Sequence, residues 1–466
     1  MTDDSDTNAD ASIDDRPTDT NDVASRLAAN GTALTTTDPT ADLADLEPGG
    51  RAFDEATVIG LGEAAHGTRE FFRLKHRLIR YLVERQEVRL FGLEANFAET
   101  LALDRYVRYG EGDPEEALAD VYFWTWNTEE LLALVEWLRA FNDGREVGDR
   151  VRFYGFDAQF TAGPAAALDS YLRTADRLAE LGIGDDLASL DDDGRLADDE
   201  ETRVARLDAA DRVVTTVGER LDIQEAAHVA ATDRGTWQLA RRHLRTLART
   251  RDHKRARHTD DSERAIAVRD RAMAANVAWM LDYANTDMDR IVLWAHNAHV
   301  SRTEDRATDG TGAPSMGYHL AERYGEEYYA LGFDFAGGTF QALADINDGY
   351  ELQACSLGDP APGVAHGVLG GERGSLLFVD LDATTADERL SAWLDEKRRM
   401  RSVGAIYYGP DETGEHHDRR VVTEAYDGVL FVRETTRAVP IHTIDYSSSR
   451  RRSARLKTHP VNPSRK

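Results

Sequence analysis

Residues 57–77, TVIGLGEAAHGTREFFRLKHR, constrain the fold of this chain more than any other stretch. The apolar run at 57–61 predicts a short strand, and Gly60 and Gly62 predict a tight turn at its end. The apolar side chains that follow recur at helical spacing, and Thr68 is a suitable N-cap for that helix. The order strand, loop, helix is the repeating unit of an α/β fold.

The loop of this unit carries one carboxylate and one imidazole, Glu63 and His66. In open α/β sheets, ligands bind beyond the carboxyl ends of the strands. The pair therefore occupies a position where chemistry is commonly placed. An ordinary connecting loop with polar residues would show the same pattern, so the pair by itself does not decide between the two interpretations.

Three further apolar runs predict strands, at 89–93, 151–156 and 290–295. The polar residues that follow them are Glu94, then Asp157 and Gln159, and then His296 and His299. Parallel strands bring their carboxyl ends to one rim of the sheet, so four such endings would meet there. This coincidence predicts an active site.

We predict an α/β fold with a central, mostly parallel sheet flanked by helices. The parts expected along the chain are a disordered acidic tail at 1–24, an α/β core at 25–162 and 287–446, a helical insertion at 163–286, and a disordered basic tail at 447–466. The insertion is too long for a simple strand-to-strand crossover. We expect it to form a helical lobe over the cleft.

The chain is strongly acidic, with a net charge of −29 and only five lysines. The acidic residues are spread along the chain, which is typical of adaptation to high salt, as in a halophile. An acidic protein has the wrong charge for binding nucleic acid.

If the acidity is a salt adaptation, the melting temperature should rise as salt is added, because ions screen the repulsion among like charges. Thermal melts from low to molar salt would measure this. A melting temperature that stays flat across that range would show that the acidity serves another purpose.

A single cysteine, Cys355, excludes a disulfide within the chain and fits a reducing cytoplasm. We expect it to pack as a small apolar residue. No apolar run is long enough for a membrane span, and the N-terminus lacks the pattern of a signal peptide. No G-x-G-x-x-G follows the first strand, so no dinucleotide cofactor is expected. Oligomeric state is not set by any of these features.

The histidines and glutamates allow two chemistries. In the first, a histidine acts as a general base on water, oriented by a neighbouring carboxylate. In the second, Glu63, His66, His296 and His299 bind a metal that polarises water or a carbonyl. The spacing H-x-x-H in a loop does not decide between them. No G-x-S-x-G motif is present, which argues against a serine hydrolase.

An unusually aromatic stretch, VYFWTWNT, precedes a well-defined helix signal. Trp124 and Trp126 fit two roles equally well, core packing or an aromatic wall of the cleft.

Several of these motifs together resemble the erythromycin esterase family. The matching stretches are GLGEAAHGTREFF, GLEANFAE, FWTWNTEELLALVEWLRAFN, YGFDAQ and VLWAHNAHV, followed by MGYHL and YDGVLFV. They occur in the family's order and cover about residues 25–440. The best-studied members hydrolyse the lactone ester of macrolide antibiotics, and members are generally regarded as metal-independent. The resemblance also implies a helical lobe over an α/β core.

The resemblance implies roles for individual residues. His66 matches the essential histidine, Glu63 its neighbouring acid, Glu94 the acid of the second strand, and His296 and His299 the two later histidines. Lys75 stands where some esterases have arginine, which puts its role in question because the two bind carboxylates differently. The residues expected to bind substrate are Lys75, Arg69, Trp124, Trp126, Asp157 and Gln159.

The predicted function is a cytoplasmic, erythromycin esterase-like hydrolase that cleaves an ester or lactone with histidine-activated water. A macrolide substrate would connect it with antibiotic resistance. Two alternatives remain at this stage. One is a metal-dependent hydrolase that uses the same residues. The other is a binding or biosynthetic accessory protein that keeps the fold without catalysis.

Overall fold

The computed structural model describes residues 20–175, 178–191, 199–259, 261–284, 290–304, 313–346, 349–358, 376–409 and 416–441. Most of the two predicted tails lies outside these residues. The expected disorder at 1–24 is wrong at its end, because helix α1 (Thr20–Asn30) already begins at Thr20. The buried side chains of Val23 and Leu27 hold this helix against the core.

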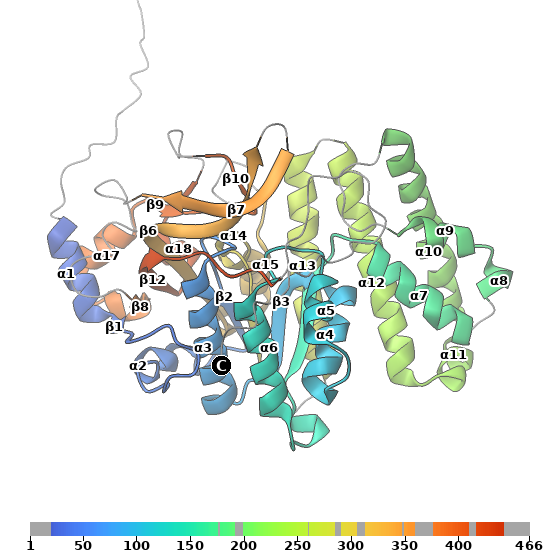
Figure 1. Cartoon of the computed structure of the whole chain (residues 1–466), viewed down its shortest axis with the longest axis horizontal. Coiled ribbons are helices and arrows are strands. Elements are labelled where there is room, and N and C mark those ends of the chain that lie inside the picture. Colours follow the sequence, from blue (N-terminus) through green and yellow to red (C-terminus); the bar gives the residue numbers. More distant parts are fainter. Residues whose placement is uncertain are drawn as a thin grey trace, which may run out of the picture.

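The centre of the protein is a ten-stranded mixed sheet (Figure 1). Its main path runs β1 (Thr32–Ala33), β8 (Leu376–Asp380), β12 (Gly428–Thr435), β6 (Tyr328–Ile346), β2 (Val58–Leu61), β5 (Ile291–Trp294), β3 (Leu90–Asn96) and β4 (Arg152–Asp157). From β12 to β4 all neighbours are parallel, while β8 and β1 are antiparallel at one edge. Strand β7 (Gly349–Leu357) pairs antiparallel with β6, and β10 (Ile406–Tyr407) pairs parallel with it. The predicted α/β class with a mostly parallel sheet is therefore confirmed.

Helices cover both faces of this sheet because its strands bury side chains on both sides. Ile59 and Val292 point into one core, which α3 (Arg69–Arg85) and α6 (Glu129–Asn142) cover. Their neighbours Val58 and Ile291 point into a second core with residues of α13 (Ser262–Ala284) and α15 (Met316–Tyr324). The remaining helices around the sheet are α2 (Glu47–Gly50), α4 (Phe97–Tyr109), α5 (Pro114–Ala119), α14 (Asn297–Val300), α15 (Met316–Tyr324), α17 (Glu388–Leu394) and α18 (Val422–Ala425).

Residues 162–284 contain only helices where the structure describes them. They are α7 (Ala162–Ala175), α8 (Leu178–Leu181), α9 (Gly184–Ser189), α10 (Glu200–Ile223), α11 (Glu225–Ala231), α12 (Arg234–His258) and α13 (Ser262–Ala284). Most of them share a separate apolar core and lie beyond the β4 edge of the sheet (Figure 1). Helix α13 returns to the sheet and packs against β4. None of the described helices is long and apolar enough to cross a membrane.

The apolar run at 328–333 predicts a short strand with Asp334 at its end, but the observed strand is much longer. Gly337 and Gly338 resemble a turn, but β6 passes straight through them to Ile346. Gly338 has φ +124°, and a Cβ there would meet the backbone oxygen of Thr435 at 2.3 Å. The glycines thus permit a close approach to β12 and do not end the strand. Asp334 consequently lies inside β6, where burial raises its pKa to about 8.

Candidate active site

The loop after β2 brings Glu63 and His66 together. His66 Nδ1 lies 2.8 Å from Glu63 Oε1, and the Glu63 side chain is completely buried. Gly62 is required just before them because a Cβ there would meet Asn297 Oδ1 at 2.2 Å. The backbone of Asn297 in turn donates a hydrogen bond to the Glu63 carbonyl oxygen at 2.9 Å. The β2 loop and the loop after β5 are therefore locked to each other.

The second carboxylate oxygen of Glu63 also has fixed partners. Lys75 Nζ and Trp294 Nε1 each donate to Oε2 at 2.8 Å. Lys75 comes from the first turns of α3, and its ammonium group also lies over the Trp294 ring. Burial lowers the pKa of Lys75 to about 8, although the Glu63 carboxylate opposes this shift. The buried pair holds Glu63 in one orientation, and Glu63 in turn orients His66.

His66 is the partly exposed member of this series of hydrogen-bonded side chains, with 12% of its side chain exposed. Because the Glu63 carboxylate can only accept at Nδ1, the neutral ring carries its proton there and keeps a free electron pair on Nε2. This arrangement is suitable for a general base.

His296 lies beside His66, with ring centroids 4.9 Å apart. It is the N-cap of α14, and its Nδ1 accepts from the backbone N–H of Ala298 at 3.2 Å. A neutral His296 must therefore carry its proton on Nε2. The two neighbouring histidines thus have opposite tautomers, one with an acceptor and the other with a donor at Nε2.

Glu94 lies at an irregularity of β3, where the register with β4 shifts between Leu93 and Asn96. Its Oε2 accepts from the backbone N–H of His296 at 2.8 Å, and its Oε1 lies 3.1 Å from His299 Nε2. Burial alone would raise the pKa of Glu94, but the charges of His299 and Arg269 hold it well below its ordinary value. Glu94 therefore fixes the loop that carries both histidines.

Arg269, from α13, joins the carboxylates of two neighbouring strands. It donates to Glu94 Oε1 at 2.8 Å and binds both oxygens of Asp157. Asp157 also accepts from the Gln159 side chain at 2.6 Å. The next residue of α13, Asp270, lies 2.9 Å from His299 Nδ1. The helical part of the chain thus contributes directly to the site.

We refer to Glu63, His66, Lys75, Glu94, Asp157, Arg269, Asp270, Trp294, His296 and His299 as the polar cluster. The structure brings together all five residues for which catalytic roles were predicted. The cluster also includes three members that the sequence analysis missed, namely Arg269, Asp270 and Trp294. For Arg269 and Asp270, the available signal was a pair of charges on the otherwise apolar face of a helix.

Several residues expected to bind substrate have other positions. Lys75 and Asp157 are wholly buried and saturated by ion pairs, so neither can contact a substrate in this arrangement. Arg69 forms an ion pair at 2.8 Å with Glu130, which is not a member of the polar cluster. Gln159 is half-buried against Asp157.

Trp124 and Trp126 are both buried, which favours core packing over an open wall. Trp126 nevertheless contacts two residues of the site, Glu94 and His66. Its indole N–H donates to the Glu94 carbonyl oxygen at 3.0 Å, and its ring lies edge-on to His66 at 6.3 Å. It therefore belongs to the core that positions the polar cluster.

The metal alternative requires several ligands that converge on one point. Within the described part of the chain, no three His, Cys, Asp or Glu side chains are grouped so that they could hold a metal ion. Both oxygens of Glu63 already accept hydrogen bonds from protein donors. The side chains present therefore do not fit a metal site.

Comparisons with known proteins identify the family of this chain. The family model for erythromycin esterase matches residues 83–435. The chain belongs to the erythromycin esterase family. Erythromycin esterase type II from Escherichia coli is 24% identical over 354 residues, covering 70% of this chain and 81% of that protein. Membership in this family indicates a hydrolase.

Two solved structures share the fold. A Bacillus cereus protein superposes with a TM-score of 0.76 at 24% identity, covering 90% of this chain and 99% of that one. A histidine variant of the erythromycin esterase EreC, in its open conformation, gives a TM-score of 0.67 at 21% identity, covering 87% and 98%. The α/β architecture with a helical part is thus the fold of the family.

Proposed function

We propose that this protein hydrolyses a carboxylic ester or lactone with water activated by His66. The observation that carries the proposal is the pair of neighbouring histidines with opposite tautomers, one of them oriented by the buried Glu63–Lys75 pair. An electron pair and a proton are thus presented side by side, as ester hydrolysis requires.

In the proposed reaction, His66 Nε2 takes a proton from water while the oxygen attacks the carbonyl carbon. The imidazolium that forms is stabilised by the Glu63 carboxylate at Nδ1. The Nε2–H of His296 donates to the carbonyl oxygen as charge develops there. The tetrahedral intermediate then collapses, the bond to the alkoxide breaks, and the proton on His66 passes to the leaving oxygen.

The names of the relatives suggest macrolide lactones as substrates. An esterase that inactivates macrolides in the cytoplasm, and so confers antibiotic resistance, is the most specific form of our proposal, and the relatives' names support its esterase part. The chemistry of the polar cluster requires only an ester carbonyl and an alkoxide leaving group, so simpler lactones and esters fit equally well.

A panel of macrolides, simple lactones and aryl esters, assayed in high salt together with metal analysis of the purified protein, tests this proposal. Turnover of at least one ester without bound metal is expected. Turnover that is lost with a chelator and restored by a metal would favour the metal-dependent alternative. A protein that binds these compounds without turnover would instead be an accessory protein of the same fold.

The pH profile should report Lys75. Its pKa of about 8 means that the folded protein loses this proton above that pH, and Glu63 then loses its cationic partner. Activity is therefore expected to fall above about pH 8. Lys75→Arg should retain activity at higher pH, because arginine stays protonated. Between pH 8 and 10.5 Lys75 is largely deprotonated in the folded protein but still protonated in the unfolded chain. The contribution of Lys75 to the free energy of unfolding therefore rises with pH over this range, while activity falls. An unchanged alkaline limb in Lys75→Arg would remove Lys75 from the mechanism.

Arg269→Lys should reduce kcat/KM by about 100-fold, because lysine keeps the charge but cannot hold Asp157 and Glu94 with a planar fork. Displacement of Glu94 would misplace the backbone of His296. Arg271→Lys, at an exposed position two residues along the same helix, is the matched control and should behave as wild type. Equal kinetics for both variants would show that Arg269 does not position the site.

A further inference from the structure

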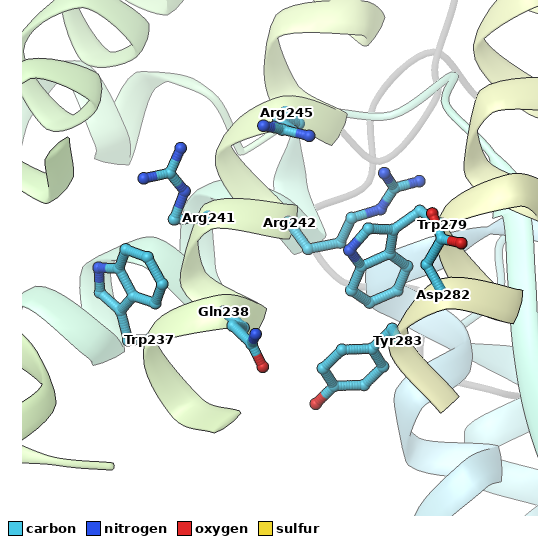
Figure 2. Close-up of a pocket in the computed structure, with 8 residues that line it drawn as sticks. All are labelled: Trp237, Gln238, Arg241, Arg242, Arg245, Trp279, Asp282 and Tyr283. Carbon is cyan, nitrogen blue, oxygen red and sulfur yellow. The ribbon is translucent and has the colours of Figure 1, made fainter. Parts of the chain in front are cut away.

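A hollow of about 250 Å³ lies between α12 and α13, on the helical part of the chain. Helix α12 lines it with Trp237 and three arginines, Arg241, Arg242 and Arg245, and α13 contributes Trp279 among others. Figure 2 shows these side chains arranged around the hollow, with Arg242 running alongside Trp279. No member of the polar cluster lines it, so it is separate from the proposed ester site.

The arginines that line this hollow carry more positive charge than the carboxylates beside them neutralise. Arg242 is almost completely buried, with 1% of its surface exposed. Its guanidinium group and that of Arg249 both donate hydrogen bonds to the side-chain oxygen of Asn276. Neither Arg242 nor Arg245 forms an ion pair with any residue that the structure describes. Burial, reinforced by the charges of Arg249 and Arg245, holds the pKa of Arg242 well below its ordinary value. A buried cation without a counter-ion is unfavourable, and a bound anion would compensate it.

The other charges at the hollow do not cancel this excess. Arg241 forms an ion pair with Asp222, and Asp282 is the acidic residue that lines the hollow. Arg242 and Arg245 together therefore outweigh Asp282. Such an excess is unusual in a chain with a net charge of −29, where solvent-exposed surfaces are expected to be acidic.

The aromatic side chains add a preference for a flat ligand. The guanidinium of Arg242 lies 4.5 Å from the centre of the Trp279 ring, and Trp279 stacks on Tyr283 at 4.4 Å. Trp237 provides a second ring, with Arg241 lying 4.9 Å from its centre. Guanidinium groups bind carboxylates and phosphates, and aromatic side chains stack on planar rings, so the two kinds of side chain together suit a ligand that has both groups. The volume lies just below the range of about 300–1,000 Å³ for ligand pockets, so the ligand should be small.

We propose that this hollow is a binding site for a small aromatic anion, a phosphate or carboxylate attached to one planar ring. The anionic group would lie against Arg242 and Arg245, and the ring would pack against Trp279 or Trp237. This inference is independent of the proposed hydrolysis, because it uses none of the residues of the polar cluster.

Calorimetric titration of the full-length protein at one fixed salt concentration tests the proposal, with phenyl phosphate, benzoate and inorganic phosphate as probes. One saturable site is expected for phenyl phosphate or benzoate. The probe that binds with the higher affinity identifies the anionic group that the site prefers. Inorganic phosphate should bind at least tenfold more weakly because it has no ring. The bound probe should also raise the melting temperature.

Arg245→Gln is the decisive variant, since Arg245 is exposed and its replacement should not affect folding. Affinity for the aromatic probe should fall about tenfold or more with the loss of a charged hydrogen-bond donor. Arg255→Gln, at an exposed arginine of the same helix that pairs with Asp211, is the matched control and should bind normally. His66→Ala should also bind normally, which separates this site from the ester site.

Several results would overturn the proposal. They are the absence of saturable binding, equal affinity in Arg245→Gln and wild type, and loss of binding in His66→Ala. Inorganic phosphate that binds as tightly as phenyl phosphate would also contradict it, because the aromatic residues would then contribute nothing.

Discussion

Replacing His66 by alanine should abolish ester hydrolysis while leaving the fold intact. Loss of a general base typically lowers the rate by about 10²–10⁴-fold. The protein should lose only about 1.5–3 kcal/mol of stability, because only one hydrogen bond to a charged group is lost. Glu63 keeps its bonds from Lys75 and Trp294, so no buried charge is left without a partner.

Turnover, melting temperature and metal content should be measured on wild type, His66→Ala and His296→Ala. His258→Ala, at a partly exposed histidine near the end of α12, is the control for a histidine change as such. A purely structural His66 would show a large fall in melting temperature along with activity. A metal ligand would show loss of bound metal in both site variants. Hydrolysis by His66→Ala at the wild-type rate would contradict the proposed mechanism.

The parallel part of the fold could be predicted from sequence because its physical signal is local. Each buried parallel strand is a short apolar run, and polar residues occur at the carboxyl end of each, at the same rim of the sheet. The strands expected at 57–61, 89–93, 151–156 and 290–295 all exist, within a few residues of their predicted bounds. Their common register explains why Glu63, Glu94 and His296 meet in space.

The contribution of α13 could not be predicted in the same way. Arg269 and Asp270 lie more than a hundred residues after Asp157, and their partners come from different strands. Their only local signal is a pair of charges on the face of the helix that also carries the buried Met273. Helical periodicity indicates which face of α13 is buried, but it does not indicate which residues of the sheet lie against that face.

Strand β6 shows a second limit, because the same residue type has two structural uses. A glycine pair commonly ends a strand, yet Gly338 in β6 instead allows close packing on Thr435. Which use applies depends on a neighbouring strand about a hundred residues later in the sequence. Asp334 was therefore expected at a strand end and is found buried within the strand.

Glu63→Gln should eliminate activity and also destabilise the protein, which distinguishes it from His66→Ala. The glutamine keeps the shape of the side chain but leaves Lys75 as a buried cation without its carboxylate. Breaking a buried pair in this way typically costs about 3–5 kcal/mol. Loss of the carboxylate should lower the pKa of Lys75 further below its present value of about 8. The unfolded state then binds more protons over a wider range, so the variant should regain stability as pH rises.

The double variant Glu63→Gln with Lys75→Met separates the two roles of Glu63. It removes both buried charges, and methionine fills most of the space of the lysine side chain, so much of the lost stability should return. Activity should stay absent, because glutamine cannot stabilise the charged form of His66. Chemical denaturation at pH 6 and pH 9, with turnover on the same samples, would measure both effects. If the double variant recovers activity with stability, Glu63 acts only by keeping Lys75 in place, and the His66 base needs no carboxylate. If it recovers neither, the unpaired charge of Lys75 is not what destabilises Glu63→Gln.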